Sequence, residues 1–322
     1  MSGHKYILFL MLVFSGASAF AQDPEFTQFY SNPLYLNPAF AGTARCPRMV
    51  MNYRNQWPSL SGTFVTSSAS YDQHVESLLG GLGLLVTSDK AGEATYTTSN
   101  FSAIYSYQLN ITRRLSLKAG FQGTYAQKNF DVSKATFGDM IDKKFGFIYP
   151  TADIISNPSR QYFDFSAGLL AYSTKYYGGF AVHHIAEPTE GFISPSAAHL
   201  PRKYTVHMGA MIPLEKSRTS STFISPNILF QQQQKFQQLN LGMYINRGPL
   251  VGGLWYRYAF TNSDALIILL GIQQGIFKFG YSYDITISKL KASGGSHEFS
   301  FGTQFECKPK RKRFRTVSCP SF

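Results

Sequence analysis

The chain has 322 residues and a formal net charge of +12, and its aromatic residues (16 %) are as frequent as its charged residues (15 %). Soluble domains typically carry about 25 % charged residues, so the composition argues against a soluble enzyme and indicates a surface that partly faces a non-aqueous solvent. Aromatic girdles at two membrane interfaces would explain the many Phe and Tyr residues. Beyond the N-terminus the sequence lacks the roughly 18 consecutive apolar residues of a helical membrane span.

The first 21 residues resemble a secretory signal peptide. His4 and Lys5 form a short basic start, residues 6–14 form an apolar core, and Ala19-Phe20-Ala21 has the small-x-small pattern of a cleavage site. An uncleaved anchor is less favoured, because the apolar run is too short to cross a bilayer. We therefore expect an exported protein that is cleaved after Ala21.

The segment 22–45 precedes the first predicted strand and combines many aromatic residues with two Asn-Pro steps. Proline disfavours a continuous strand or helix, and so many aromatic side chains are not expected to remain in water. We expect the segment to be ordered, either as an inward-folded plug or partner-docking strip, or packed against the periplasmic rim of the membrane domain that follows. The residues concerned are Phe26, Phe29, Tyr30, Asn32, Pro33, Tyr35, Asn37, Pro38 and Phe40.

Residues 46–307 show the period-two alternation of β-strands. In 277–288, for example, Phe279, Tyr281 and Tyr283 alternate with polar residues such as Ser282 and Asp284, so we expect the aromatic side chains to face lipid and the polar ones to face the lumen. Many segments exceed the usual strand length of about five or six residues. The sequence therefore predicts an all-β fold, a transmembrane antiparallel β-barrel of about 14 strands. The strands are expected near 47–57, 62–74, 79–88, 95–110, 114–130, 160–173, 175–185, 201–213, 219–232, 236–246, 249–260, 264–273, 275–287 and 296–307.

The lengths of the connections predict the topology. When the connections are numbered along the chain, the even-numbered ones are short. All the long ones, such as 131–159 and 186–200, are odd-numbered. Outer-membrane barrels have short periplasmic turns and longer external loops. We therefore expect an outer-membrane location with both termini in the periplasm.

The chain has three cysteines, Cys46, Cys307 and Cys319, which in an exported protein could form one disulfide and leave one free thiol. Barrel closure would bring Cys46 and Cys307 together, and Cys319 could pair with either. We favour a bond that involves Cys319, with a slight preference for Cys307–Cys319, because it would restrain an otherwise mobile tail.

The C-terminal tail, 308–322, is strongly basic. A run of positive charge attracts anionic surfaces or acidic partners, here acidic periplasmic proteins or inner-leaflet phospholipid headgroups, since nucleic acid is not expected for an exported protein. A solvated tail without a partner is the alternative. The charges are Lys308, Lys310, Arg311, Lys312, Arg313 and Arg315.

No catalytic, cofactor-binding or metal-binding site is evident in the sequence. His183 and His184, with Glu187 and Glu190 nearby, have the residue types of a metal site, but adjacent residues of a strand point to opposite faces. Phosphate-loop, metal-box and catalytic-triad signatures are missing. We therefore expect neither enzymatic activity nor a cofactor or metal.

Several segments match a family pattern in order along the chain: 28–42 (QFYSNPLYLNPAFAG), 53–58 (YRNQWP), 70–75 (SYDQHV), 163–168 (FDFSAG), 248–257 (GPLVGGLWYR), 278–284 (KFGYSYD) and 314–322 (FRTVSCPSF). They resemble the PorP/SprF family of type IX secretion system membrane proteins of Bacteroidota. The resemblance implies a non-enzymatic outer-membrane barrel of the secretion or gliding machinery. Such a barrel either docks periplasmic, peptidoglycan-linked components or supports export or surface anchoring of a cognate large adhesin. An outer-membrane channel or transporter for small or hydrophobic solutes is the alternative, and an outer-membrane enzyme such as a lipase is a third.

Overall fold

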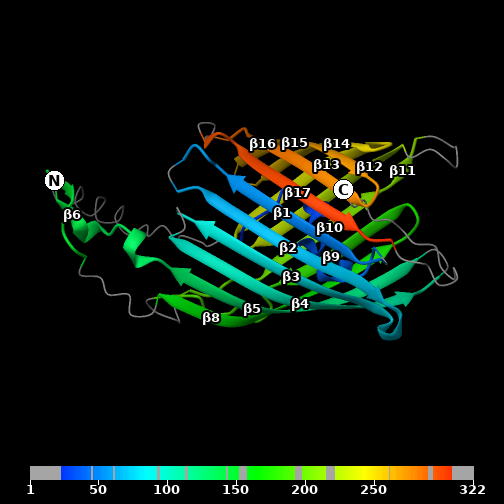
Figure 1. Ribbon diagram of the computed structural model, residues 1–322, viewed down its shortest axis with the longest axis horizontal. Helices are drawn as coiled ribbons and strands as arrows, with labels where there is room; N and C mark the ends of the chain where they lie inside the picture. The colour runs from blue at the N-terminus through cyan, green and yellow to red at the C-terminus, as the bar shows by residue number, and fades with distance from the viewer. Residues whose placement is uncertain are drawn as a thin grey trace, which may run out of the picture.

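Long antiparallel strands form a closed 14-stranded barrel in the computed structural model (Figure 1). The structure describes residues 23–44, 46–60, 62–92, 95–112, 115–142, 144–151, 158–192, 198–214, 222–260, 262–288 and 293–306. The barrel strands are β1 (Arg48–Gln56), β2 (Phe64–Val75), β3 (Gly80–Ala91), β4 (Tyr96–Asn110), β5 (Ser116–Phe130), β8 (Ser159–Tyr172), β9 (Tyr176–His183), β10 (Lys203–Ala210), β12 (Phe223–Gln233), β13 (Phe236–Arg247), β14 (Leu250–Ala259), β15 (Asn262–Gln274), β16 (Phe277–Thr286) and β17 (Ser296–Gln304). Each overlaps one of the predicted strands, and the predicted fold is confirmed.

Closure comes from the pairing of the first and last strands. β1 runs antiparallel to β17 from Arg48 opposite Gln304 to Gln56 opposite Ser296. On the other side of the barrel β10 pairs with both β9 and β12. Every long strand thus has two neighbours, which removes the open edges that would otherwise recruit other chains.

The strand register places apolar side chains outside and polar side chains inside. In β16 the side chain of Phe279 is 55 % exposed, whereas Ser282 is fully buried and Asp284 nearly so. Because side chains alternate strictly along a strand, these exposures determine which side chains of β16 point outward and which point into the lumen. The expected division into lipid-facing and lumenal residues is confirmed for β16.

The two ends of the barrel differ in their connections. At one end, here called the long-loop end, lie 131–158 and 184–202; the first of these carries the small hairpin β6 (Ile141–Asp142) and β7 (Gly146–Phe147), which extends away from the barrel in Figure 1. At the other, short-turn end, the connection 211–222 is longer than expected, because β11 (Ile212–Pro213) continues the pairing with β12. Among the described residues there is no helix with the length and hydropathy of a membrane span.

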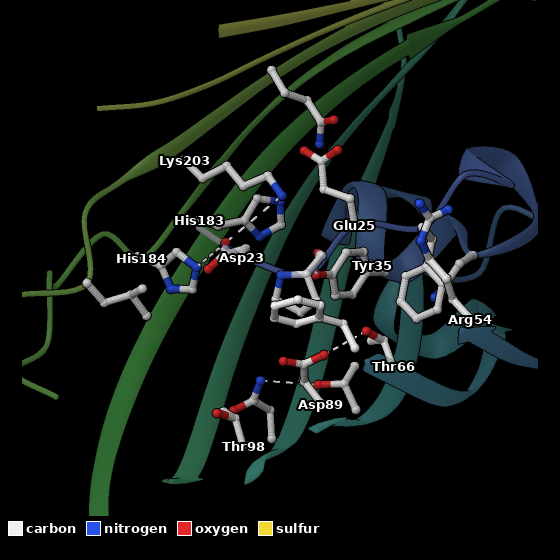
Figure 2. Close-up of a pocket in the computed structure, with 18 of the residues that line it drawn as sticks. Asp23, Glu25, Tyr35, Arg54, Thr66, Asp89, Thr98, His183, His184 and Lys203 are labelled. Atoms are coloured by element: carbon white, nitrogen blue, oxygen red, sulfur yellow. Dashed lines mark hydrogen bonds and ion pairs between the residues drawn. The ribbon is translucent and has the colours of Figure 1, made fainter. Parts of the chain in front are cut away.

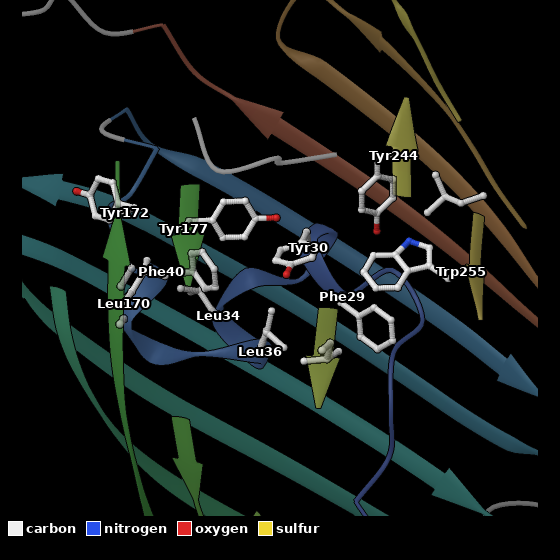
Figure 3. Close-up of a cluster of buried hydrophobic side chains, with 14 of the residues drawn as sticks. Phe29, Tyr30, Leu34, Leu36, Phe40, Leu170, Tyr172, Tyr177, Tyr244 and Trp255 are labelled. Atoms are coloured by element: carbon white, nitrogen blue, oxygen red, sulfur yellow. The ribbon is translucent and has the colours of Figure 1, made fainter. Parts of the chain in front are cut away.

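The chain before β1 folds into three short helices, η1 (Phe29–Ser31), α2 (Pro33–Leu36) and η2 (Pro38–Phe40). Figure 3 shows these helices inside the barrel, with Phe29, Tyr30, Leu34 and Phe40 directed at side chains of the surrounding strands. Proline can occupy the first turn of a helix without losing a hydrogen bond, and both Asn-Pro steps are used in this way. Residues 23–42, called the lumenal segment below, are thus an inner core enclosed by the barrel wall.

Candidate functional site: the lumenal segment and its vestibule

Glycines on three strands form a cradle for the end of the lumenal segment. A Cβ atom added to Gly81 of β3 would lie 2.2 Å from the carbonyl oxygen of Ala41, and one added to Gly120 of β5 would lie 2.3 Å from the amide nitrogen of Ala39. At Gly168 of β8 the distance to the Asn37 side-chain oxygen would be 2.0 Å. The backbone of 37–42 therefore rests directly on the wall, at a distance that only glycine permits.

Asn37, from the second Asn-Pro step, joins the lumenal segment to three further points on the wall. Its Nδ2 donates to the carbonyl oxygens of Leu169 (3.1 Å) and Phe180 (3.3 Å) and lies 3.2 Å from Nε2 of His207. The ring of Phe40 stacks on the same histidine. One buried amide thus connects the segment to β8, β9 and β10.

A buried charge network holds the opposite side of the segment. Glu298 of β17 accepts the backbone N–H groups of Thr27 (2.5 Å) and Gln28 (3.2 Å). Arg54 links Glu298 to Asp284, and Arg257 also donates to Asp284. Charges buried this deeply are tolerated only when they are paired and hydrogen-bonded, so loss of one partner would leave an uncompensated charge inside the barrel.

The first described residue, Asp23, is held by an ion-pair bridge. His184 lies between Asp23 (2.8 Å) and Asp164 (2.7 Å), and Nζ of Lys203 lies 4.0 Å from Asp23 (Figure 2). Burial alone would lower the pKa of His184, but the charge of Asp23 and hydrogen bonds to Asp164 and Asp23 raise this pKa to about 10. His184 is therefore positively charged at neutral pH.

The expectation that His183 and His184 point to opposite faces is wrong. β9 ends at His183, and His184 has a φ of +57°, which turns its ring back into the lumen. His183 lies 3.4 Å from the carbonyl oxygen of Leu36. Within the part of the chain that the structure describes, acidic, histidine and cysteine side chains form no cluster suited to a metal ion.

Asp23 and Glu306 lie at opposite ends of the barrel. Asp23 contacts His184, Lys203 and Gln233, all at the long-loop end, whereas Phe305, next to Glu306, pairs with Pro47 at the short-turn end. The lumenal segment thus runs through the lumen along the wall, rather than remaining below the rim. The expected periplasmic position of both termini stays a prediction, because residues 1–22 and 307–322 lie outside the described residues.

A cavity of about 920 Å³, called the vestibule below, lies between the lumenal segment and the long-loop end (Figure 2). The lumenal segment contributes Glu25, Phe26 and Tyr35 to its lining. Strands β2 to β5 contribute mainly neutral polar side chains such as Thr66 and Gln122. Ion-paired residues complete the lining, among them Lys128, Asp164, Glu190, Lys203 and Arg257.

The residues singled out in 22–45 come together inside the barrel. All are buried except Tyr35, which is partly exposed to the vestibule. They are Phe26, Phe29, Tyr30, Asn32, Pro33, Asn37, Pro38 and Phe40. Sequence reasoning did not identify the wall residues that receive them; glycines inside alternating runs were the available signal, because such glycines often mark a close approach of another backbone.

Cys46 is disulfide-bonded. Cys307 and Cys319, the other two cysteines, lie outside the described residues. A bond at Cys46 within this chain uses one of them and so excludes the expected Cys307–Cys319 pairing; its partner stays a prediction. The signal peptide and the basic tail with Lys308, Lys310, Arg311, Lys312, Arg313 and Arg315 also lie outside the described residues.

Comparison with known proteins decides the family. A family model described as type IX secretion system membrane protein PorP/SprF matches residues 18–303. The chain belongs to the PorP/SprF family. The family and the barrel together identify an outer-membrane component of type IX secretion. A comparison with curated protein sequences finds no match.

Solved structures with similar folds are outer-membrane proteins. The toluene transporter TbuX of Ralstonia pickettii has a TM-score of 0.53 at 9 % identity, over 86 % of this chain and 94 % of that one. Omp33 of Acinetobacter baumannii has a TM-score of 0.46 at 6 % identity, over 81 % of this chain and 98 % of that one. At such low identity the likeness to TbuX concerns the fold alone.

Proposed function

We propose that this PorP/SprF protein is a non-enzymatic component of the type IX secretion and gliding machinery. It supports export or surface anchoring of a cognate large adhesin, or docks periplasmic secretion components. The observation that supports this role is the occupied lumen. A barrel whose interior is filled by its own buried N-terminal segment is poorly suited to conduct a polypeptide, so its contribution would come from the surfaces at its two ends.

In this proposal the short-turn end is periplasmic and the long-loop end is external, with the signal peptide cleaved after Ala21. The external surface includes the β6–β7 hairpin, where Phe145 is 68 % exposed and Phe147 and Tyr149 are also exposed. Exposed aromatic side chains of this kind are typical of protein contact sites. The basic tail would contact acidic periplasmic partners, including peptidoglycan-linked proteins.

The test is affinity purification of the tagged protein from native membranes. Two variants separate the surfaces: Phe145→Ser with Phe147→Ser in the hairpin, and replacement of the six basic tail residues by Gln. We expect the first variant to lose a large secreted adhesin and the second to lose periplasmic components. Phe163→Leu, an apolar exchange on the outer face of β8, is the control. Recovery of neither class of partner with the unaltered protein would contradict the proposal.

A second candidate function is transport of small or hydrophobic solutes. The vestibule of about 920 Å³ favours it, since cavities of roughly 300–1,000 Å³ accommodate small molecules. TbuX, described as a toluene transporter, shares the barrel fold. Solute-dependent conductance or uptake by the purified protein would support this function over the first.

A further inference from the structure

The cations around the vestibule are already paired. Arg54 binds Asp284 and Glu298, and Lys128 binds Glu190 at 3.0 Å. Arg257 binds Asp284 at 3.1 Å, and Lys203 and protonated His184 both approach Asp23. These positive charges are therefore neutralised by the protein itself and are not left over for an anionic ligand.

Two carboxylates of the vestibule, Asp89 and Glu25, form no ion pair at contact distance. Lys128 and Arg257 attract them only at longer range, and both cations are already paired, with Glu190 and Asp284. Asp89 of β3 accepts a hydrogen bond from the Thr66 hydroxyl at 2.6 Å, and Glu25 of the lumenal segment accepts one from Nε2 of Gln238 at 2.9 Å. Within the described ranges, no cationic nitrogen lies within 4.0 Å of either carboxylate. Figure 2 shows Asp89 and Glu25 coming from different parts of the lining, the wall and the lumenal segment.

Buried amide groups point to the same kind of ligand independently of charge. Gln122 and Gln231 line the vestibule and are more than nine-tenths buried, yet among the described residues neither side-chain oxygen has a hydrogen-bond partner. The Gln122 amide nitrogen already donates to Ser102 and Thr124, so only its acceptor is left. A buried acceptor without a partner is costly. A ligand that brings hydrogen-bond donors would satisfy these acceptors once the amide side chains turn towards it.

We propose that the vestibule binds lysine or arginine side chains of an extended basic segment of a partner protein. Ammonium and guanidinium groups supply a positive charge at contact distance from Asp89 and Glu25, and they bring hydrogen-bond donors that suit the amide oxygens of Gln122 and Gln231. The aromatic lining, including Tyr35 and Trp57, can cover the aliphatic stems of such side chains and contact the cation. The proposal concerns a binding site and does not depend on the secretory role.

Binding is measured on the purified full-length protein in detergent by fluorescence anisotropy. The probes are labelled alternating Lys-Ala and Glu-Ala decapeptides, with spermidine and maltotriose as unlabelled competitors. We expect binding of the Lys-Ala peptide alone, weakened at high ionic strength because part of the attraction is Coulombic. The combined Asp89→Asn and Glu25→Gln substitutions should weaken it roughly tenfold, a loss of about 1.4 kcal/mol.

The charge-matched control is Asp131→Asn, in the external connection and outside the lining of the vestibule; it should bind the Lys-Ala peptide like the unaltered protein. Heat-modifiable gel mobility checks that each variant is folded. Absence of Lys-Ala binding, equal binding of the Glu-Ala peptide, or an equal effect of Asp131→Asn would overturn the proposal. So would displacement of the peptide by maltotriose, which would indicate a carbohydrate site, or full displacement by micromolar spermidine, which would indicate a polyamine site.

Discussion

Single glycine residues decide whether the lumenal segment fits in the barrel. Gly120 and Gly168 face each other on neighbouring strands, and both touch the backbone or side-chain atoms of 37–39. A methyl group at either position would occupy space that the segment already fills. Since backbone atoms cannot rotate away as a flexible side chain can, the strand or the segment would have to move.

We therefore expect Gly120→Ala to destabilise the folded protein by about 1–3 kcal/mol, the usual cost of overpacking, and to expose the lumenal segment to proteases. Urea unfolding and limited proteolysis in detergent measure the two effects. Gly123→Ala is the matched control on the same strand, because its Cβ would meet only a Phe165 carbon at 3.9 Å. Equal stability of the two variants would contradict the claim that the lumenal segment packs directly against Gly120.

The stability that the ion pair between His184 and Asp23 contributes depends on pH. Its pKa is raised from 6.5 to about 10, because the charge of Asp23 and the hydrogen bonds to Asp164 and Asp23 outweigh the opposing effect of burial. A group whose folded pKa lies above its unfolded value stabilises fully below the unfolded pKa. Its contribution therefore declines above pH 6.5 and is lost as the pH rises through about 10.

The expected result is a difference in unfolding free energy between the unaltered protein and His184→Gln that is largest near pH 6 and shrinks towards pH 10. Urea unfolding at several pH values measures it. His199→Gln is the control, since the His199 side chain is exposed in a connection and its hydrogen-bond partner is the Glu187 carbonyl oxygen. A difference that grows with pH would mean that His184 is neutral in the folded protein.

At the scale of elements, the strands could be predicted and the lumenal segment could not. Alternation along β16 is a local property, because each side chain has either lipid or the lumen as its environment. The three short helices η1, α2 and η2 have no periodic signal. Their positions depend on contacts with distant residues such as Gly120, Glu298 and His207. Aromatic content predicted that the segment would be ordered, and it left an inward-folded plug or docking strip and packing against the periplasmic rim as alternatives.

The turn at His184 could not be predicted for a related reason. A strand pattern continues through His183-His184 in the sequence, whereas the chain leaves the sheet there with a positive φ. This conformation is uncommon outside glycine. The attraction of the ring to Asp23 and Asp164, which are remote in sequence, accounts for it. Pairs of this kind are not visible to reasoning from local spacing.

The outer face of the strands makes a direct prediction about lipid. Leu270 of β15 is 64 % exposed and lies opposite Tyr281 within the β15–β16 ladder. Arginine on the lipid face costs about 2–4 kcal/mol near the bilayer midplane. We expect Leu270→Arg to reduce the free energy of folding in lipid vesicles by this amount, and Leu270→Val to have little effect. Equal folding of both variants would place Leu270 away from the hydrocarbon region.

At the scale of the whole molecule, the barrel and its lumenal segment form one closed unit. The segment contacts β2, β3, β5, β8, β9 and β10 on one side and β16 and β17 on the other. Phe29 and Tyr30 fill the remaining space against Tyr244 and Trp255. The vestibule lies on the long-loop side of the segment. From this arrangement we expect no continuous path between the vestibule and the short-turn end.

Conductance in planar bilayers separates a closed secretion component from a solute channel. We expect the unaltered protein to conduct little, because a buried core of side chains leaves no continuous water path. Replacing 29–41 by a Gly-Ser linker of the same length should open the lumen and raise conductance to that of an unobstructed barrel. Gly120→Ala, which keeps every residue of the segment but disturbs its seat, should show intermittent openings, and Gly123→Ala should remain closed. High, steady conductance of the unaltered protein would instead favour the solute channel, since the segment would then not seal the barrel.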